Sequence, residues 1–337
     1  MSHRSKIILG ISFGHGDSSA ALLADGKILA AAEEERFNRI KHYAGYPTEA
    51  VKFCLEEARL KPEQVQVVAI AKKPTNQFIK RAALIVSQPH RIWKSLGKNT
   101  GGTPSFKEWL AQVEISHARI HRTEHHLSHM LSTQFLTQNE DVAYLSFDGL
   151  GDFVSASIGK TERGRIQILN RVTFPHSLGF FYTGLTQYLG FPYFGDEFKV
   201  MGLSSYGQPS FISQMRNLIR EAEPFGFRLN LEAFPVLKSP KIFTVKNQQP
   251  WVETLYNAPY LTAILGVPPR KPGEPLQDVH RDLAKSIQVR FEEIANHLLK
   301  SLESVSSSET LCLSGGCAHN SVWGGKIPQV SPPGPVS

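Results

Sequence analysis

Three side chains of this sequence could together bind a metal ion. His125 and His129 are four residues apart, so they would share one face at the start of a helix. Asp148 stands at the tip of an apolar, strand-like run. Two imidazoles and one carboxylate suit iron, zinc or manganese and leave coordination positions open for phosphate or water. The alternative is a pair of ordinary hydrogen-bonded histidines. Zinc-protease chemistry is disfavoured, because His-His-Leu-Ser-His lacks the adjacent glutamate of the His-Glu-x-x-His pattern.

Three turns that contain glycine could hold the phosphates of a nucleotide. Gly-His-Gly-Asp occupies residues 14–17, and Asp-Gly-Leu-Gly-Asp occupies residues 148–152. The backbone N–H groups of such turns can approach phosphate oxygens because no side chain intervenes. Ser-Gly-Gly at residues 314–316 is a third candidate, at a strand-to-helix junction. Each turn alone could be an ordinary hairpin, but two at equivalent positions of a repeat favour a nucleotide cleft.

A weak internal repeat supplies the elements that position these turns, since Ser12-Phe13 matches Ser146-Phe147. The first copy predicts strands and helices in the order of the segments 6–13, 18–23, 27–32, 47–58 (helix), 65–70, 115–120 and 127–135 (helix). The second copy predicts strands and helices at 142–147, 153–160, 165–172, 279–302 (helix), 311–313 and near 318–322 (helix). We assign both copies to a βββαβαβα unit, which predicts an α/β fold of two domains with one topology and mixed sheets.

The second copy is expected to be incomplete. The repeat requires a fifth strand and a closing helix after Lys326, but the prolines of the last residues bar both. We therefore expect a first domain at 1–140 that carries the metal-binding helix, and a second at 141–327 with an insertion at about 174–275. Residues 328–337 are expected to form a disordered tail.

The composition predicts a folded protein with two core-bearing units, since the 337 residues are 41% hydrophobic and 20% charged. A net charge of +7 suits anionic ligands such as phosphates, but without a long basic run nucleic-acid binding is not expected. Cys54, Cys312 and Cys317 lack the spacing of a disulfide framework or a zinc ribbon, which favours a reducing compartment. No apolar stretch approaches the ~20 residues of a membrane helix, so we expect a cytoplasmic protein without a membrane partner.

A resemblance to a known family rests on segments spread over nearly the whole chain, to about Ile327: 10–23, 25–42, 125–129, 148–152, 174–207 and 311–320. The most specific are Phe-Pro-His-Ser-Leu-Gly-Phe-Phe-Tyr at 174–182 and Gly-Asp-Glu-Phe-Lys-Val-Met-Gly-Leu at 195–203. They resemble the O-carbamoyltransferases of nodulation-factor and antibiotic biosynthesis. The amino-terminal domain of that family is similar to the threonylcarbamoyl-transferring protein that modifies tRNA, but these segments look like the O-carbamoyl branch.

The resemblance implies an actin-like, ribonuclease-H-type double fold that uses ATP and a divalent metal. It implies that His125, His129 and Asp148 are the metal ligands, with Fe²⁺ as the expected ion and Zn²⁺ or Mn²⁺ as alternatives. It also implies a nucleotide-contacting lysine and an adenosine side of the cleft. Together with the glycine turns, it gives the expected nucleotide-binding residues Lys41, Asp148, Gly149, Gly151, Gly315, Gly316 and Asn320.

A complete member of this family makes carbamoyl adenylate from carbamoyl phosphate and ATP in a carboxy-terminal YrdC-like domain, then transfers the carbamoyl group to an acceptor hydroxyl. His15 is the candidate for handling the acceptor's proton, since an unperturbed imidazole has a pKa of about 6.5. In this chain Gly16 separates His15 from Asp17, where the family has His directly before Asp. The family's fourth metal ligand, an aspartate in a Gly-Asp-x-Gly turn, and the YrdC-like domain would both lie beyond residue 337.

The sequence therefore predicts the transferase domain of an O-carbamoyltransferase, incomplete as this chain. Its partners would be carbamoyl phosphate or carbamoyl adenylate, a hydroxyl-bearing acceptor, and a separate chain that carries the YrdC-like domain. The alternative is a non-catalytic nucleotide-binding remnant or a subunit of a split enzyme. Sugar, aminoglycoside-like and lipo-oligosaccharide acceptors all stay open.

Other polar residues have two interpretations from sequence alone. The glutamates at 33–35 could belong to a site or to a solvated strand end. Glu197 and Lys199, expected on a strand or loop, could contact a ligand or form a surface ion pair. Cys312 and Cys317 are expected to be small buried hydrophobic residues rather than nucleophiles.

Overall fold

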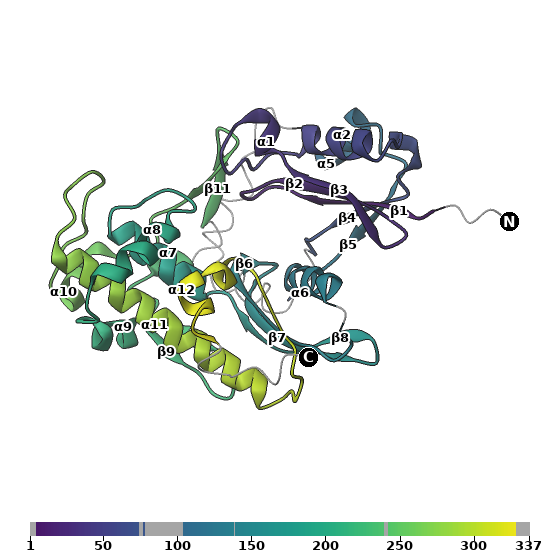
Figure 1. Cartoon of the computed structure of the whole chain (residues 1–337). Helices are drawn as coiled ribbons and strands as arrows, with labels where there is room; N and C mark the ends of the chain where they lie inside the picture. The colour runs from purple at the N-terminus through teal and green to yellow at the C-terminus, as the bar shows by residue number, and fades with distance from the viewer. Residues whose placement is uncertain (1–4, 74–76, 78–103, 138, 239–241, 328–337) are drawn as a thin grey trace. The chain divides into compact units, whose positions relative to one another are not determined.

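The computed structural model describes residues 5–73, 77, 104–137, 139–238 and 242–327. The chain divides into two compact units (Figure 1). Unit 1 comprises residues 1–74, 82–124 and 243–252, and unit 2 comprises 75–81, 125–242 and 253–337. The expected subdomain boundary between residues 140 and 141 stays a prediction; by its packing, helix α6 (His125–Leu136) belongs to unit 2.

Unit 1 is built on a five-stranded sheet with the order β3-β2-β1-β4-β5. The first three strands form an antiparallel meander, while β4 is parallel to β1 and β5 is parallel to β4. Helices α2 and α5 pack on the alternating apolar residues of β1, which are Ile7, Leu9 and Ile11. The bounds are β1 Ile7–Ser12, β2 Ser19–Ala24, β3 Lys27–Glu33, α1 Glu35–Asn38, α2 Thr48–Glu57, η1 Pro62–Gln64, β4 Val67–Ile70, α5 Phe106–Gln112 and β5 Arg119–Arg122.

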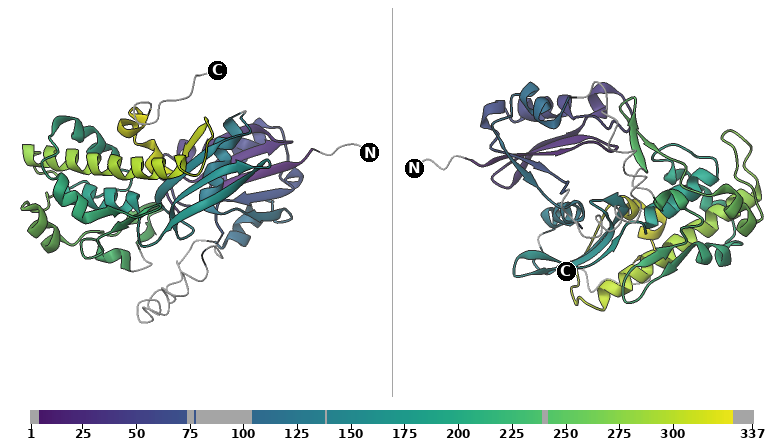
Figure 2. Two further views of the ribbon diagram at one scale, coloured as in Figure 1. Left: turned by 90° about the horizontal axis from the view of Figure 1, so that it is seen from below. Right: turned by 180° about the vertical axis from the view of Figure 1, so that it is seen from behind.

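Unit 2 is built on a four-stranded sheet with the order β13-β6-β7-β8. Strands β6, β7 and β8 form an antiparallel meander, and β13 is parallel to β6. Figure 2 shows α11 as the long yellow-green helix of this unit. Its bounds are α6 His125–Leu136, β6 Ala143–Gly151, β7 Val154–Glu162, β8 Arg165–Thr173, α7 Leu178–Tyr188, α8 Glu197–Leu203, η2 Ser204–Tyr206, α9 Ile212–Leu218, β9 Ile219–Glu221, β10 Phe227–Leu229, η3 Pro235–Lys238, α10 Ala258–Leu265, α11 Asp278–Glu303, β13 Leu311–Ser314, η4 Gly316–His319 and α12 Ser321–Gly324.

A hairpin from the second half of the sequence completes unit 1. Strands β11 (Phe243–Lys246) and β12 (Gln249–Val252) pair with each other, antiparallel. Their turn is bonded to the loop before α2, since Ala44 N–H donates to the Gln248 carbonyl and Gln249 Nε2 donates to the Lys41 carbonyl at 2.8 Å. Sequence proximity alone would have assigned this hairpin to the second half.

The duplicated topology is confirmed. The order β8-β7-β6-β13 of unit 2 repeats the order β3-β2-β1-β4 of unit 1, including the antiparallel meander and the parallel fourth strand. Within the described ranges β13 has a strand on one side only, whereas β4 lies between β1 and β5. The predicted fold class is confirmed as a mixed α/β fold with the same sheet topology in two copies.

Most predicted elements lie within two residues of the observed ones, but β6 runs to Gly151 rather than Phe147, and α12 begins at Ser321 rather than near Ala318. The strand expected at 115–120 is wrong for its first half, because β5 begins only at Arg119. Ile115 instead closes the end of α5, where its N–H donates to the Leu110 carbonyl and its side chain is buried. In the part of the chain that is described, no helix is long and apolar enough to cross a membrane.

Candidate metal centre

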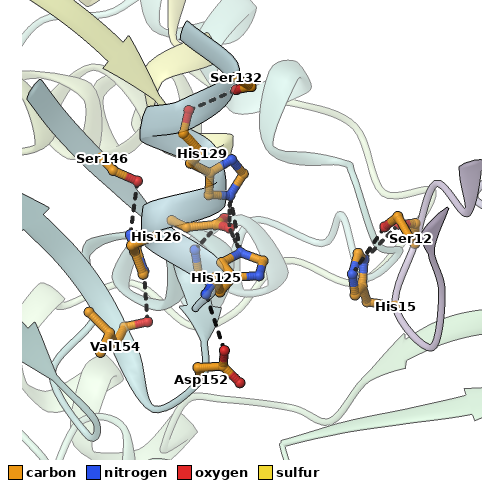
Figure 3. A network of polar contacts seen from close by, with 12 residues as sticks. Ser12, His15, His125, His126, His129, Ser132, Ser146, Asp152 and Val154 are labelled. Carbon is orange, nitrogen blue, oxygen red and sulfur yellow. Dashed lines mark hydrogen bonds and ion pairs between the residues drawn. The ribbon is translucent and has the colours of Figure 1, made fainter. Parts of the chain in front are cut away.

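The three predicted metal ligands converge in unit 2. His125 Nε2 and His129 Nε2 are 3.0 Å apart, and they lie 3.2 and 3.3 Å from Asp148 Oδ2. Figure 3 shows the His125 and His129 rings turned toward each other from one face of α6. Atoms bound to one ion at ~2.1 Å lie about 3.0–3.4 Å apart for angles of about 90–109°. The donor set therefore fits a divalent metal without rearrangement.

Asp148 reaches this position because the pairing of β6 and β7 is interrupted between Phe147 and Gly151. The residues between them leave the ladder at the end of β6, which lets the Asp148 carboxylate face α6. Its other oxygen, Oδ1, accepts the N–H of Gly149 at 2.7 Å. The carboxylate is thus fixed by its own turn on one side and presented to the imidazoles on the other.

The first turn of α6 is held by the same turn of β6 and β7. The His125 N–H donates to Asp152 Oδ2 at 3.1 Å, so a carboxylate satisfies a helix N-terminal donor (Figure 3). A Cβ at Gly151 would lie 2.0 Å from His125 Cδ2, so only glycine leaves room for the ring. Gly151 was predicted to bind nucleotide; in the structure it lies against a predicted metal ligand.

The electrostatics of the site concern Asp148 and His126. Burial alone would raise the pKa of Asp148, but hydrogen bonds and charge from His125 and His129 hold that pKa well below its ordinary value. The carboxylate therefore stays ionised. Between the two ligands, His126 is fully buried, and burial lowers its pKa to about 4, which keeps this ring neutral.

The second glycine turn lies against the first. Because β6 and β13 are parallel neighbours, their carboxyl ends meet at one edge of the sheet. A Cβ at Gly316 would lie 2.9 Å from Asp148 Oδ1, and one at Gly315 would lie 2.3 Å from the Phe147 carbonyl oxygen. Gly315 has φ +90°, a conformation that glycine adopts readily. Backbone at Gly149 and Gly316 therefore lies against the Asp148 carboxylate, and backbone at Gly315 lies against the preceding residue, Phe147.

Asn320 follows this turn, but its side chain is bonded within the protein. Its Nδ2 donates to Gln288 Oε1, and Gln288 Nε2 donates to Asn320 Oδ1, both at 2.9 Å. The same Oδ1 accepts the Trp323 N–H and caps α12. A contact of Asn320 with adenosine stays a prediction.

The other two predicted site residues, His15 and Lys41, belong to unit 1. The exposed His15 ring lies 3.0 Å from the Gly16 carbonyl through Nδ1 and 3.4 Å from Ser12 Oγ through Nε2 (Figure 3). Lys41 Nζ is 2.7 Å from Glu35 Oε1. The lysine is thus oriented by a buried carboxylate, which sequence reasoning did not identify.

The glutamates at 33–35 are not a solvated strand end. Glu34 is buried and accepts the N–H groups of Glu49 and Ala50 at 3.1 and 2.8 Å, at the start of α2. Glu35 is buried beside Lys41 and also accepts the N–H of His42 at 3.0 Å. Only Glu33, which pairs with Arg36, fits the surface interpretation. In the sequence, only the nearby Lys41 indicated that Glu35 could have a charged partner.

Glu197 and Lys199 lie on helix α8, so the prediction of a strand or loop was wrong. A strand prediction spaces them on one face, whereas on a helix they point in different directions. Lys199 pairs with Asp196 at 2.6 Å, and Glu197 accepts a hydrogen bond from Thr183. Cys317 is buried, as expected, and burial raises its pKa.

Asp17 and His42 form an acid–imidazole pair in unit 1, with Nδ1 and Oδ1 2.9 Å apart. This hydrogen bond raises the pKa of His42 and lowers that of Asp17. The His42 contribution to stability is therefore complete below about pH 6.5 and is lost as the pH rises through the raised pKa. The Asp17 contribution is present above about pH 3.9 and is lost as the pH falls through the lowered pKa.

We expect Asp17→Asn to lower the pKa of His42, because the neutral amide no longer stabilises the imidazolium. The measurement is a pH titration of the His42 ring signals by NMR. Asp25→Asn is the matched control, since Asp25 also has a positive φ but bonds to the Lys6 N–H, and it should leave the pKa of His42 unchanged. Equal titration of His42 in wild type and Asp17→Asn would contradict the pairing.

Comparisons with known proteins show the family to which the chain belongs. A family model described as Carbamoyltransferase N-terminus matches residues 7–332. An uncharacterised protein of Synechocystis sp. is 31% identical over 333 residues, which are 95% of this chain and 52% of that protein. Nodulation protein NolNO of Sinorhizobium fredii is 31% identical over 336 residues, 96% of this chain and 44% of that protein. The chain spans about half the length of these curated relatives.

Among solved structures, HypF of T. kodakarensis aligns with 97% of this chain and 44% of its own chain. The TM-score is 0.41, and the sequence identity is 11%.

Proposed function

The chain belongs to the carbamoyltransferase N-terminus family, and from this premise we propose that it carries the site that transfers a carbamoyl group from carbamoyl adenylate to an acceptor hydroxyl. The observation that carries the proposal is the set of His125, His129 and Asp148, whose ligand atoms lie within 3.3 Å of one another beside two glycine turns. The Asp148 carboxylate suits a metal ion, and backbone N–H donors beside it suit a phosphate group that the metal would accompany.

In this proposal His125, His129 and Asp148 hold a divalent ion, with Fe²⁺ preferred over Zn²⁺ or Mn²⁺. When bound, the ion supplies Lewis-acid chemistry that neutralises phosphate charge. The turns around Gly149 and Gly315 bring backbone N–H groups to the phosphate of the adenylate. In unit 1, Lys41, which pairs with Glu35, stays the predicted nucleotide-contacting lysine.

The transfer step needs one proton acceptor. The acceptor oxygen bonds to the carbamoyl carbon, the bond from that carbon to the phosphate oxygen breaks, and AMP leaves. His15 takes the hydroxyl proton, since a neutral imidazole can act as a general base near pH 7. The acceptor class stays open among sugars, aminoglycoside-like molecules and lipo-oligosaccharides.

A second candidate function rests on the length of the relatives. Because the chain spans 52% and 44% of two of them, the step that forms carbamoyl adenylate can belong to a YrdC-like part outside these 337 residues. The chain would then be the nucleotide-binding and transferring part of a split enzyme, or a binding subunit without turnover. A cytoplasmic location stays a prediction in either case.

An activity experiment separates these candidates. The chain is incubated with ¹³C-labelled carbamoyl phosphate, ATP, Fe²⁺ and an aminoglycoside or oligosaccharide acceptor, and mass spectrometry detects the carbamoylated product. We expect no product from the chain alone, and product when the carboxy-terminal part of the Synechocystis relative is added. Turnover by the chain alone would contradict the division of steps. If the combined proteins form carbamoyl adenylate, detected as pyrophosphate release, but no acceptor is carbamoylated, the binding subunit is favoured.

A further inference from the structure

A row of serines crosses the sheet of unit 2 beneath α6. Ser314 on β13 pairs with Ser146 on β6, and Ser146 pairs with Ser157 on β7. Directly paired residues of neighbouring strands project to the same face of a sheet. We call these three residues the serine row, and all of them are buried. Arg171 on β8 continues the row, since it pairs with Ser157.

The face that carries the serine row is the one covered by α6. Tyr144, two residues from Ser146, packs with Met130 of α6, and a Cβ at Gly159 would lie 3.4 Å from the Met130 sulfur. The carboxyl-terminal part of α6 thus rests on an apolar surface. Its amino-terminal part, which carries His125 and His129, contacts the hydroxyl of Ser146 through His126.

His126 joins α6 to the middle of the row. Its Nε2 is 3.0 Å from the Val154 carbonyl oxygen, and its Nδ1 is 2.9 Å from Ser146 Oγ (Figure 3). A carbonyl only accepts, so Nε2 carries the ring proton and Nδ1 accepts the hydroxyl hydrogen of Ser146. Ser146 has then donated its only hydrogen, and toward its neighbours in the row it can only accept.

The two flanking serines have hydroxyls that require a partner. Ser157 Oγ and Ser314 Oγ are buried, and no atom of the described residues is within hydrogen-bond range of either. The Nε of Arg171 is also buried without a hydrogen-bond partner among the described residues. A buried polar group without any partner costs ~1–3 kcal/mol, and three in one row are not expected by chance.

The spacing of the row suits bridging water. Neighbouring strands are ~4.8 Å apart, and neither flanking hydroxyl is within hydrogen-bond range of Ser146 Oγ. Two hydrogen bonds of about 2.8 Å through one water span up to about 5.6 Å. A water that donates to Ser146 can accept from Ser157 or Ser314, and buried waters make ~3 such bonds.

We propose that the serine row is a hydration site, in which ordered waters bridge Ser157 and Ser314 to the Ser146–His126 pair and thereby position the metal-ligand end of α6. The serines are positioning residues, because they act on His125 and His129 through the helix. The positioning part of this inference rests on the proposed metal centre. The hydration part does not.

The hydration part is tested on the metal-free chain. The test is whether Ser157→Ala lowers or raises the Tm. If Ser157 is bonded to water, Ser157→Ala breaks the network, and the Tm should fall by about 2–4 °C. If the hydroxyl is dry, its removal relieves an unpaired buried group, and the Tm should rise. An unchanged or raised Tm overturns the proposal. Ser314→Ala is the second variant and should also lower the Tm.

A crystal structure of the wild-type chain gives a direct reading. Electron density for water within 3.2 Å of Ser157 Oγ and Ser146 Oγ is expected. A site filled by side-chain atoms instead would overturn the hydration of the row.

The positioning part is tested with Co²⁺ as the probe, by titration and by its visible absorption spectrum. Ser146→Ala and Ser157→Ala should raise the Co²⁺ dissociation constant about tenfold and change the ligand-field bands, as outer-shell changes do at metal sites. Ser155→Ala is the matched control: Ser155 is on the same strand and also buried, but its hydroxyl already donates to a protein group, the His176 carbonyl. It should lower the Tm but leave Co²⁺ binding unchanged.

The two proposals fail in different ways. A wild-type chain that binds no Co²⁺ removes the proposed metal centre and the positioning role, while the Tm and crystallographic results still decide the hydration. If the wild-type chain binds Co²⁺, and Ser146→Ala and Ser157→Ala bind it with the same affinity as wild type, only the positioning role is removed.

Discussion

Asp148→Asn should lower metal affinity by more than the ~10–100-fold that outer-shell partners cost, because it removes a ligand itself. The change is nearly isosteric. Asparagine Oδ1 can still accept the Gly149 N–H, while an amide NH₂ replaces the oxygen that faces His125 and His129. Two imidazoles remain, without the negative charge that makes the set attractive to a divalent ion. The measurement is the amount of metal bound per chain, by elemental analysis after loading with Fe²⁺ or Co²⁺. The Tm confirms that the variant is folded.

His125→Ala and His129→Ala should have a similar effect, since each removes one of three donors. His297→Ala is the matched control, because its ring contacts the Ala222 carbonyl on another part of unit 2 and should leave metal binding unchanged. Unchanged metal stoichiometry in Asp148→Asn or His125→Ala would remove the metal assignment and with it the proposed role of the site.

Gly315→Ala should reduce the free energy of unfolding by at least ~3 kcal/mol. A side chain at φ +90° is strained, and its Cβ would lie 2.3 Å from the Phe147 carbonyl oxygen, a backbone atom that cannot turn away. Relief would have to separate the end of β13 from β6, which holds Asp148. Urea unfolding followed by circular dichroism gives the stability, and calorimetric titration with ATP should show that binding is lost.

Gly202→Ala is the control for this change. Gly202 lies in α8 with nothing within 4 Å of an added Cβ, and alanine favours a helix by up to ~1 kcal/mol over glycine. It should therefore be neutral or stabilising and should leave ATP binding intact. Equal stability of Gly315→Ala and wild type would refute the close approach of the two turns.

Local sequence patterns were sufficient to predict the repeat and the common helix face of two of the three predicted metal ligands. Apolar alternation and turn residues predicted the meanders of both units, because strand periodicity and hairpin chemistry act over a few residues. The spacing of His125 and His129 fixed their common helix face for the same reason. The first half of the segment 115–120 was misassigned, because Ile115 is buried by tertiary packing after α5 rather than by strand pairing.

Other features required the folded chain. Glu34 and Glu35 look like surface residues in sequence, and only packing against α2 and the loop at Lys41 buries them. The hairpin of β11 and β12 joins unit 1 from about 200 residues away in sequence, a distance at which no periodicity extends.

The sequence by itself determined that two histidines, one aspartate and several glycine turns are carried by a duplicated α/β framework. Only the tertiary structure decided that Gly151 makes room for His125, that Asp152 caps its helix, and that a serine row lies underneath. The physical reason is the range of the interactions. Helix and strand patterns are set by neighbours along the chain, whereas these contacts join residues that become neighbours only when separate strands align in register.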